Sequence, residues 1–214
     1  MEEAYRLLEL MSQRGLHPDV VTFNTMISGL CKEGKMEEAN GLMELMSQRG
    51  LQPNVVTFTT MISGLCKVGK MEEANGLFEL MNQRGLQPDV VTFTTMISGL
   101  CKEGKMEEAN GLMELMSQRG LQPNVVTFTT MISGLCKVGK MEEANGLFEL
   151  MNQRGLQPDV MTFTKLISGL CEVGKMEEAY GLLELISERG LWRTTINQTK
   201  NATLELITSY CSKS

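Results

Sequence analysis

The stretch VVTFNTMISGLCKEGKMEEANGLMELMSQRGLQPN, residues 20–54, decides the fold, because it recurs along the chain with a period of 35 residues. A fixed internal period of this length predicts a stack of small units rather than one or two conventional domains. The unit is followed by four further copies, numbered here as repeats 2 to 5 after the first: 55–89, 90–124, 125–159 and 160–194.

The two ends of the chain depart from the complete unit. Residues 1–19 match only its second half, so they predict a partial repeat with the second helix alone, acting as an N-terminal cap. The pattern breaks after Leu191 and recovers in a more polar form, so we expect a C-terminal capping helix in residues 195–214. Residues 25–90 recur unchanged as 95–160, which indicates a designed consensus sequence or a very recent duplication.

Each unit contains the signals for two helices. The segment PDVVTFTTMISGLCKEG supplies an Asp or Asn cap after Pro, an apolar stripe and a closing Gly. The segment KMEEANGLMELMSQRG has two Glu in its opening turn, where the helix dipole favours anions, and then apolar residues at helical spacing. Short loops make the two helices an antiparallel hairpin, which predicts an all-α solenoid of helix-turn-helix repeats.

A glycine lies inside the predicted second helix, in the segment NGL. Gly in a helix interior costs about 1 kcal/mol relative to Ala. We therefore expect these residues where two helices approach closely: Gly41, Gly76, Gly111 and Gly146.

Composition limits the core and the chemistry. Hydrophobic residues make up 42% of the chain and aromatic residues only 5%, so Leu, Ile, Val and the 18 Met must fill the core. Five of the six Cys recur at one core position, which predicts free thiols and a reducing compartment: Cys31, Cys66, Cys101, Cys136 and Cys171. With one His and no CxxC motif, we expect neither a metal nor another cofactor.

The net charge of −6 argues, taken alone, against a nucleic-acid partner. Lysines nevertheless recur just after each first helix and predict a basic stripe, while the Glu pairs of the second helices are expected largely on another face. These candidate phosphate-contacting residues are Lys32, Lys35, Lys67, Lys70, Lys102, Lys105, Lys137, Lys140 and Lys175.

Several functional classes find no support. The chain has no nucleophile motif and no Gly-rich phosphate loop, so we expect no enzyme and no small-molecule substrate. The acidic start MEEAYRLLEL is unlike a targeting segment, and no apolar run approaches the length of a membrane span. A soluble chain without a membrane partner is the expectation.

The unit closely resembles the pentatricopeptide repeat in its length, its T-F-x-T-x-I-x-G-L-C-K start, its G-K-M-E-E-A centre and its G-L-x-P-D end. The resemblance covers nearly the whole chain and implies a right-handed superhelical α-solenoid. It also implies sequence-specific binding of single-stranded RNA, one base per repeat. Members of this family act mostly in mitochondria and plastids, but the sequence itself gives no localisation beyond a reducing compartment.

The resemblance implies that the fifth and last residues of each repeat recognise the base. The pairs are Asn24 with Asn54, Thr59 with Asp89, Thr94 with Asn124, Thr129 with Asp159, and Thr164 with Thr194. An ionised Asp only accepts hydrogen bonds, which suits the ring N–H of guanine or uracil, whereas Asn can also donate to adenine or cytosine. In the family, Thr at the fifth position goes with purines and Asn with pyrimidines, so repeats 1–4 imply 5′-CGAG-3′, with a weak purine preference in repeat 5.

Two further roles are implied by the family. A residue near the start of each repeat packs against a base: Val21, Val56, Val91, Val126 and Met161. The Phe two positions later is expected in the core: Phe23, Phe58, Phe93, Phe128 and Phe163.

Alternatives remain open at this stage. The last residue of each repeat is also a helix cap, a role in which Asp and Asn are interchangeable, and the two roles can coexist. A solenoid of this kind could instead be a protein- or peptide-binding scaffold, or a purely structural repeat. We expect a monomer or a weak homodimer.

Overall fold

The computed structural model describes residues 2–188, which form eleven α-helices and no strand. The predicted C-terminal capping helix and Thr194 lie outside the described residues. The all-α class and the helix-turn-helix repeats are confirmed. After α1 (Glu2–Gln13), first and second helices alternate: α2 (Val20–Lys32), α3 (Met36–Gln48), α4 (Val55–Lys67), α5 (Met71–Gln83), α6 (Val90–Lys102), α7 (Met106–Gln118), α8 (Val125–Lys137), α9 (Met141–Gln153), α10 (Val160–Glu172) and α11 (Met176–Glu188).

Each first helix begins at the Asp or Asn that the sequence marks as its cap. At α2, the Asp19 carboxylate accepts a hydrogen bond of 2.8 Å from the backbone N–H of Thr22, and the Thr22 hydroxyl accepts one from the Asp19 backbone. This reciprocal capping box satisfies backbone donors that the first turn leaves without a partner. The same box opens α4, α6 and α8, so the expected caps are confirmed.

A glycine in the left-handed conformation follows each helix from α1 to α10. Gly34 has φ 76° and follows α2, while the N–H of Lys35 donates to the carbonyl of Leu30 at 2.9 Å. Only Gly adopts this conformation without steric cost. The reversal brings α3 antiparallel to α2, and Gly69, Gly139 and Gly174 do the same in repeats 2, 4 and 5.

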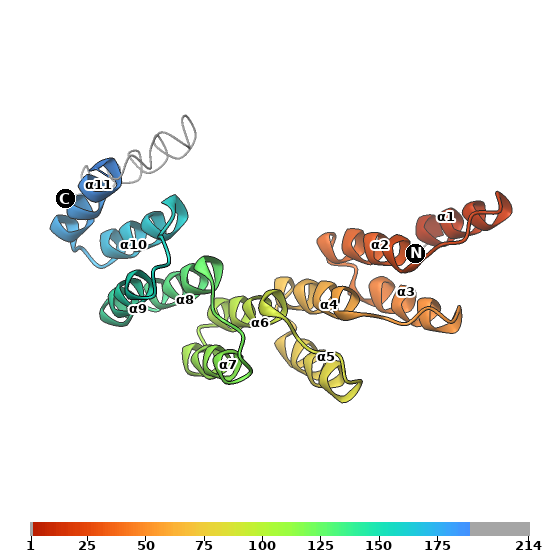
Figure 1. Ribbon diagram of the computed structural model, residues 1–214. Coiled ribbons are helices and arrows are strands. Elements are labelled where there is room, and N and C mark those ends of the chain that lie inside the picture. The colour runs from red at the N-terminus through yellow and green to blue at the C-terminus, as the bar shows by residue number, and fades with distance from the viewer. Residues whose placement is uncertain (1, 189–214) are drawn as a thin grey trace. The chain divides into compact units, whose positions relative to one another are not determined.

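Two compact units divide the chain, Met1–Glu103 and Gly104–Ser214. In the first unit, α2, α4 and α6 pack side by side in a row, and α3 and α5 pack beside them (Figure 1). In the second unit, α8 packs against α10, while α9 and α11 form hairpins with these two helices. Within each unit, the first helices therefore form one layer and the second helices another.

The core lies between the two layers. The five Phe predicted to fill it are all fully buried, as is Met46, so the aromatic prediction is confirmed and Met contributes to the core as expected. The five repeated Cys are buried free thiols, and burial raises the pKa of Cys31, Cys66, Cys101 and Cys136 to about 11. They serve as small apolar side chains rather than as ligands or nucleophiles.

The expectation for the NGL glycines is wrong. A carbon added at Gly76 or Gly146 would meet no atom within 4 Å. The close approach occurs instead at the glycine of ISG in the first helices. A carbon added at Gly64 would lie 2.8 Å from both Cβ and Sγ of Cys31 in the preceding first helix. Neighbouring first helices approach closely at this position, which leaves no room for a side chain larger than that of glycine.

We predict that Gly64→Ala destabilises the protein by about 1–3 kcal/mol, because the added methyl group overpacks the contact with Cys31. The measurement is the urea unfolding midpoint followed by circular dichroism.

The matched control is Gly76→Ala, which introduces the same methyl group at an exposed position of α5. We expect this change to stabilise the protein by about 0.5–1 kcal/mol through helix propensity alone. Equal effects of the two substitutions would contradict the assignment of the close approach.

Candidate nucleic-acid interface

The candidate interface lies at the amino ends of the first helices, where consecutive repeats meet. The fifth residue of one repeat lies one turn into its first helix, beside the cap of the next first helix. We call this meeting point a junction and define it by three residues: the fifth residue, the cap, and the Thr three positions after the cap. The described junctions are Asn24–Asn54–Thr57, Thr59–Asp89–Thr92 and Thr129–Asp159–Thr162.

The junction between repeats 2 and 3 joins its residues through a buried hydroxyl. Thr59 Oγ1 and Thr92 Oγ1 lie 2.7 Å apart, and the Thr92 hydroxyl donates to Asp89 Oδ1 at 2.9 Å. The backbone N–H of Thr92 also donates to Asp89 Oδ1, at 2.8 Å. Thr92 is fully buried, whereas Thr59 is half-buried and Asp89 is exposed. The predicted pair Thr59 and Asp89 is therefore linked by Thr92 and faces solvent.

The junction between repeats 4 and 5 repeats this arrangement in the second unit. Thr129 Oγ1 lies 2.7 Å from Thr162 Oγ1, and Thr162 donates to Asp159 Oδ1 through its hydroxyl at 2.9 Å and through its backbone N–H at 2.8 Å. Two Thr–Asp repeats thus have the same geometry.

The first junction, with Asn at both positions, is organised differently. The Thr57 hydroxyl donates to Asn24 Oδ1 at 2.7 Å and also lies 3.1 Å from Asn54 Oδ1. The Asn24 amide nitrogen lies 3.5 Å from Asn54 Oδ1, a long contact. Here the two predicted base-recognition residues contact each other as well as the buried Thr.

The other two predicted pairs fall outside the described junctions, because their members belong to different units or lie beyond the described residues. Thr94 belongs to the first unit and Asn124 to the second. The Thr164 hydroxyl donates to the Val160 carbonyl of its own helix at 2.7 Å, and its predicted partner lies outside the described residues.

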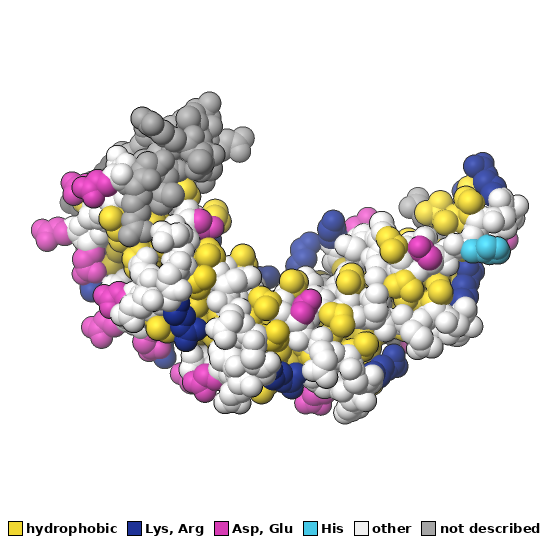
Figure 2. Space-filling view, in the orientation of Figure 1, with side chains coloured by type: hydrophobic (Ala, Val, Ile, Leu, Met, Phe, Trp, Pro, Cys, Tyr) yellow, Lys and Arg dark blue, Asp and Glu magenta, His cyan; other side chains and the backbone are white. Residues whose placement is uncertain are grey.

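The predicted base-packing residues are exposed apolar side chains. Their exposed fractions are high for large hydrophobic residues, which marks a surface available to a ligand. The values are 69% for Val21, 57% for Val56, 61% for Val91, 61% for Val126 and 51% for Met161. Figure 2 shows apolar side chains at the surface of both units, among polar ones.

A groove in the first unit combines all three predicted roles. It has a volume of about 270 Å³ and is lined by the base-recognition residue Thr59, the base-packing residue Val91, and the lysines Lys32 and Lys67. Lys67 Nζ donates to the Lys32 carbonyl at the end of α2, at 2.7 Å. A cation is thus held at the groove beside the end of the neighbouring first helix.

Lysines that precede the second helices form ion pairs with carboxylates. Lys70 Nζ lies 2.9 Å from Glu73, and Lys175 Nζ lies 3.0 Å from Glu178. The hydrogen bond to Glu73, together with the charge of that carboxylate, raises the pKa of Lys70. The expectation that acidic and basic residues lie on different faces is therefore wrong at these positions. The three-residue spacing places the second Glu of each pair beside the lysine.

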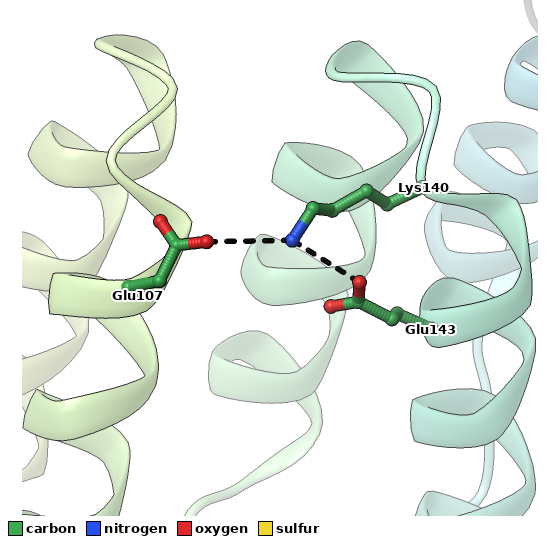
Figure 3. A network of polar contacts seen from close by, with 3 residues as sticks. All are labelled: Glu107, Lys140 and Glu143. Carbon is green, nitrogen blue, oxygen red and sulfur yellow. Dashed lines mark hydrogen bonds and ion pairs between the residues drawn. The ribbon is translucent and has the colours of Figure 1, made fainter.

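Lys140 contacts two carboxylates from different repeats (Figure 3). Its Nζ atom lies 3.1 Å from Glu143 of its own repeat and 3.5 Å from Glu107 of the preceding one. The hydrogen bond and charge of Glu143 come first among the causes that raise the pKa of Lys140. These ion pairs are exposed, so they link repeats weakly and remain open to exchange with another anion.

Comparison with known families now identifies the repeat. The model of the PPR repeat family matches residues 1–32, 18–67, 53–102, 88–137 and 123–172, and the PPR repeat model matches residues 161–191. The chain belongs to the pentatricopeptide repeat (PPR) family.

Solved PPR structures share the fold. The PPR protein PPR10, crystallised in complex with an 18-nt psaJ RNA element, is 28% identical with a TM-score of 0.76, over 85% of this chain and 27% of PPR10. PPR10 from maize matches at 27% identity with a TM-score of 0.66, over 94% of this chain and 27% of that one. This chain therefore spans about a quarter of the length of PPR10.

A more distant PPR structure supports the fold alone. The PPR domain of Arabidopsis thaliana protein-only RNase P 1, in complex with tRNA, is 17% identical with a TM-score of 0.65, over 89% of this chain and 96% of that one. A search of curated proteins gave no match.

Two searches of the described PPR repeats gave negative results. Within residues 2–188, no three His, Cys, Asp or Glu side chains are grouped so that they could hold a metal ion. No helix in the same part is long and apolar enough to cross a membrane.

The sequence analysis missed the buried Thr of each PPR junction. Thr57, Thr92, Thr127 and Thr162 are fully buried, the described polar residues with the least exposure. A signal was present, because Thr three positions after Asp or Asn is a capping-box pattern. That pattern predicts the bond to the cap, but not the bond to the preceding repeat.

We predict that Asp89→Ala destabilises the protein by about 1 kcal/mol, because α6 loses the side chain that caps it. Asp89→Asn should change stability by only a few tenths of a kcal/mol, since Asn caps α4 in the same manner. Urea unfolding of both variants tests this, and equal losses would show that the cap does not depend on a side-chain acceptor.

Proposed function

We propose that the chain binds single-stranded RNA sequence-specifically, one base per repeat, with repeats 1–4 recognising the core 5′-CGAG-3′. It acts by binding and not by catalysis. The contacting residues are the base-recognition pairs, the base-packing residues and the lysines named from the sequence. The proposal includes a monomer or weak homodimer in a reducing compartment.

The observation that carries this proposal is the junction. Side chains that differ among nearly identical repeats, such as Asn24 and Thr59, are hydrogen-bonded into the cap of the next first helix and remain accessible. Variation at a rigid, accessible position is what a recognition surface needs, because a fixed donor or acceptor discriminates between ligands better than a mobile one.

The chemistry of the last residue supports different bases in different repeats. The Asp89 and Asp159 carboxylates only accept hydrogen bonds, which suits the N–H groups of guanine. Asn54 and Asn124 also carry amide donors, which suit the bare ring nitrogens of cytosine and adenine. Capping requires an acceptor alone, so it does not account for the alternation of Asp and Asn.

The surroundings supply affinity without sequence preference. Exposed Val91 and Val56 are available to pack against base faces, and Lys32 and Lys67 border the groove where the phosphates would pass. Four bases at about 1–2 kcal/mol each give a gross gain of about 4–8 kcal/mol, so we expect micromolar or weaker binding.

Comparison with PPR10 supports the class of ligand. The structure of that relative holds an 18-nt RNA element. Since this chain spans 27% of PPR10, we propose a shorter RNA site.

The first test measures binding of short RNAs by fluorescence anisotropy at several salt concentrations. An oligomer containing CGAG should bind about tenfold more tightly than ones containing CAAG or CGGG, because a mismatched hydrogen-bond pattern leaves polar groups unpaired. Equal affinities would refute base recognition. Absence of any salt-dependent binding would refute RNA binding and favour the protein-binding scaffold.

The second test changes one base preference. Asp89→Asn should move the preference of repeat 2 from guanine towards adenine, so that CAAG binds at least as tightly as CGAG. Asp19→Asn is the matched control, because Asp19 caps α2 in the same way but follows no first helix in this chain. A switch produced by both variants would contradict recognition at the junction.

A further inference from the structure

The buried hydroxyl of Thr92 has only one arrangement of its hydrogen bonds. It contacts Asp89 Oδ1 at 2.9 Å, Thr59 Oγ1 at 2.7 Å and the Asp89 backbone N–H at 3.4 Å. An ionised carboxylate cannot donate, so the single Thr92 proton goes to Asp89. The two lone pairs of Thr92 then accept from the Asp89 backbone and from the Thr59 hydroxyl.

This arrangement determines what Thr59 presents to solvent. Its only proton is used in the bond to Thr92, so towards a ligand it offers lone pairs alone. Asp89 receives both Thr92 donors on Oδ1, which leaves Oδ2 as its outward acceptor. The pair Thr59 and Asp89 therefore presents two acceptors and no donor. Thr129, Thr162 and Asp159 repeat the contacts between the two hydroxyls and the carboxylate.

Among the four RNA bases, only guanine matches two adjacent acceptors. Its Watson–Crick edge has a ring N–H next to an exocyclic amino group, which are two neighbouring donors. Uracil has one ring N–H between two carbonyls, and adenine and cytosine each place an unprotonated ring nitrogen beside their amino group. An acceptor-only junction repels that ring nitrogen and finds no second donor on uracil.

The first junction has the opposite polarity. The Thr57 hydroxyl donates outward to Asn24 Oδ1 at 2.7 Å, which occupies one of its two lone pairs, and the Asn24 amide keeps an N–H donor besides its long contact with Asn54 Oδ1. The amide of Asn54 adds further N–H donors, because its Oδ1 receives the Thr57 backbone N–H at 3.1 Å. A donor-rich junction of this kind suits cytosine, whose ring nitrogen and carbonyl are neighbouring acceptors.

We propose that Thr92 and Thr162 are positioning residues that set the hydrogen-bond polarity of the base-recognition pair, making the Thr–Asp junctions acceptor-only and selective for guanine. This inference rests on the proposed function, since it explains how a junction would discriminate between bases. It gives a part in that discrimination to a buried residue that no base touches.

The test is Thr92→Val, which removes the hydroxyl and preserves the shape of the buried side chain. Without its inward acceptor, the Thr59 proton is free to point at the ligand and to satisfy the ring nitrogen of adenine. Binding of CGAG and CAAG oligomers should then show a guanine preference at the second base about fivefold smaller than in the parent protein, mainly through tighter adenine binding. Thr92→Ser, which restores the hydroxyl, should restore the preference.

Two matched controls separate positioning from stability. The Thr92→Val protein should keep the parent preference for guanine over adenine at the fourth base, because Thr162 is unchanged. Thr22→Val removes the same Thr–Asp cap bond at α2, where the Thr22 hydroxyl contacts no fifth residue. It should lower stability to a similar extent and leave base preference unchanged.

A second variant keeps the proposal testable if Thr92→Val does not fold. Thr59→Val changes a half-buried residue and removes the outward acceptor itself. In the parent protein, replacing the guanine at the second base with inosine, which lacks the exocyclic amino group, should weaken binding about fivefold. In Thr59→Val, guanine and inosine should bind equally.

The outcomes distinguish the two proposals. If the parent protein prefers guanine at the second base but Thr92→Val keeps that preference unchanged, the polarity role is wrong and RNA recognition stands. If inosine weakens binding to Thr59→Val as much as it weakens binding to the parent protein, the polarity role is likewise wrong and RNA recognition stands. If the parent protein does not distinguish CGAG from CAAG, base recognition fails and the polarity role fails with it.

Discussion

The hydrogen bond from the third backbone N–H of each first helix to its capping side chain is the interaction on which the structure depends. At α6 it joins Thr92 to Asp89, and it determines where the helix begins. Because neighbouring first helices pack side by side, the cap also determines which residue of the preceding repeat lies beside it. Helix initiation, the contact between repeats and the candidate recognition site therefore share the same few atoms.

Much of the fold could be predicted because its signals are local. A cap at Asp19, a left-handed Gly34 and the spacing of the buried Phe and Cys each depend on residues close in sequence. Two of the errors concern contacts between repeats. Gly64 approaches Cys31, and Thr59 bonds Thr92, each pair 33 residues apart in the chain. The repeat period shows that such neighbours exist, but not which atoms touch, because that depends on how closely the helices pack.

Several cations of the predicted stripe already have partners in the free protein. Lys67 is held against the end of α2, and Lys140 lies between Glu107 and Glu143. Under the proposed function, an RNA phosphate would have to compete with these partners, which would weaken the contribution that does not depend on sequence. Base contacts would then form a larger share of the total, and the net charge of −6 would act in the same direction.

The contact of Gly64 with Cys31 affects the spacing between neighbouring first helices. The same contact is made by Gly99 with Cys66 and by Gly169 with Cys136. With one hydrogen atom against one cysteine side chain, neighbouring first helices lie close together at this contact. The distance between consecutive helix caps is thereby fixed within each unit. If the subunits of a bound polymer are spaced differently from the caps, the mismatch grows along the chain. After a few subunits they would no longer align, even if each subunit alone fitted its position. The smallest side chain in the repeat therefore limits how many consecutive positions can be matched at once.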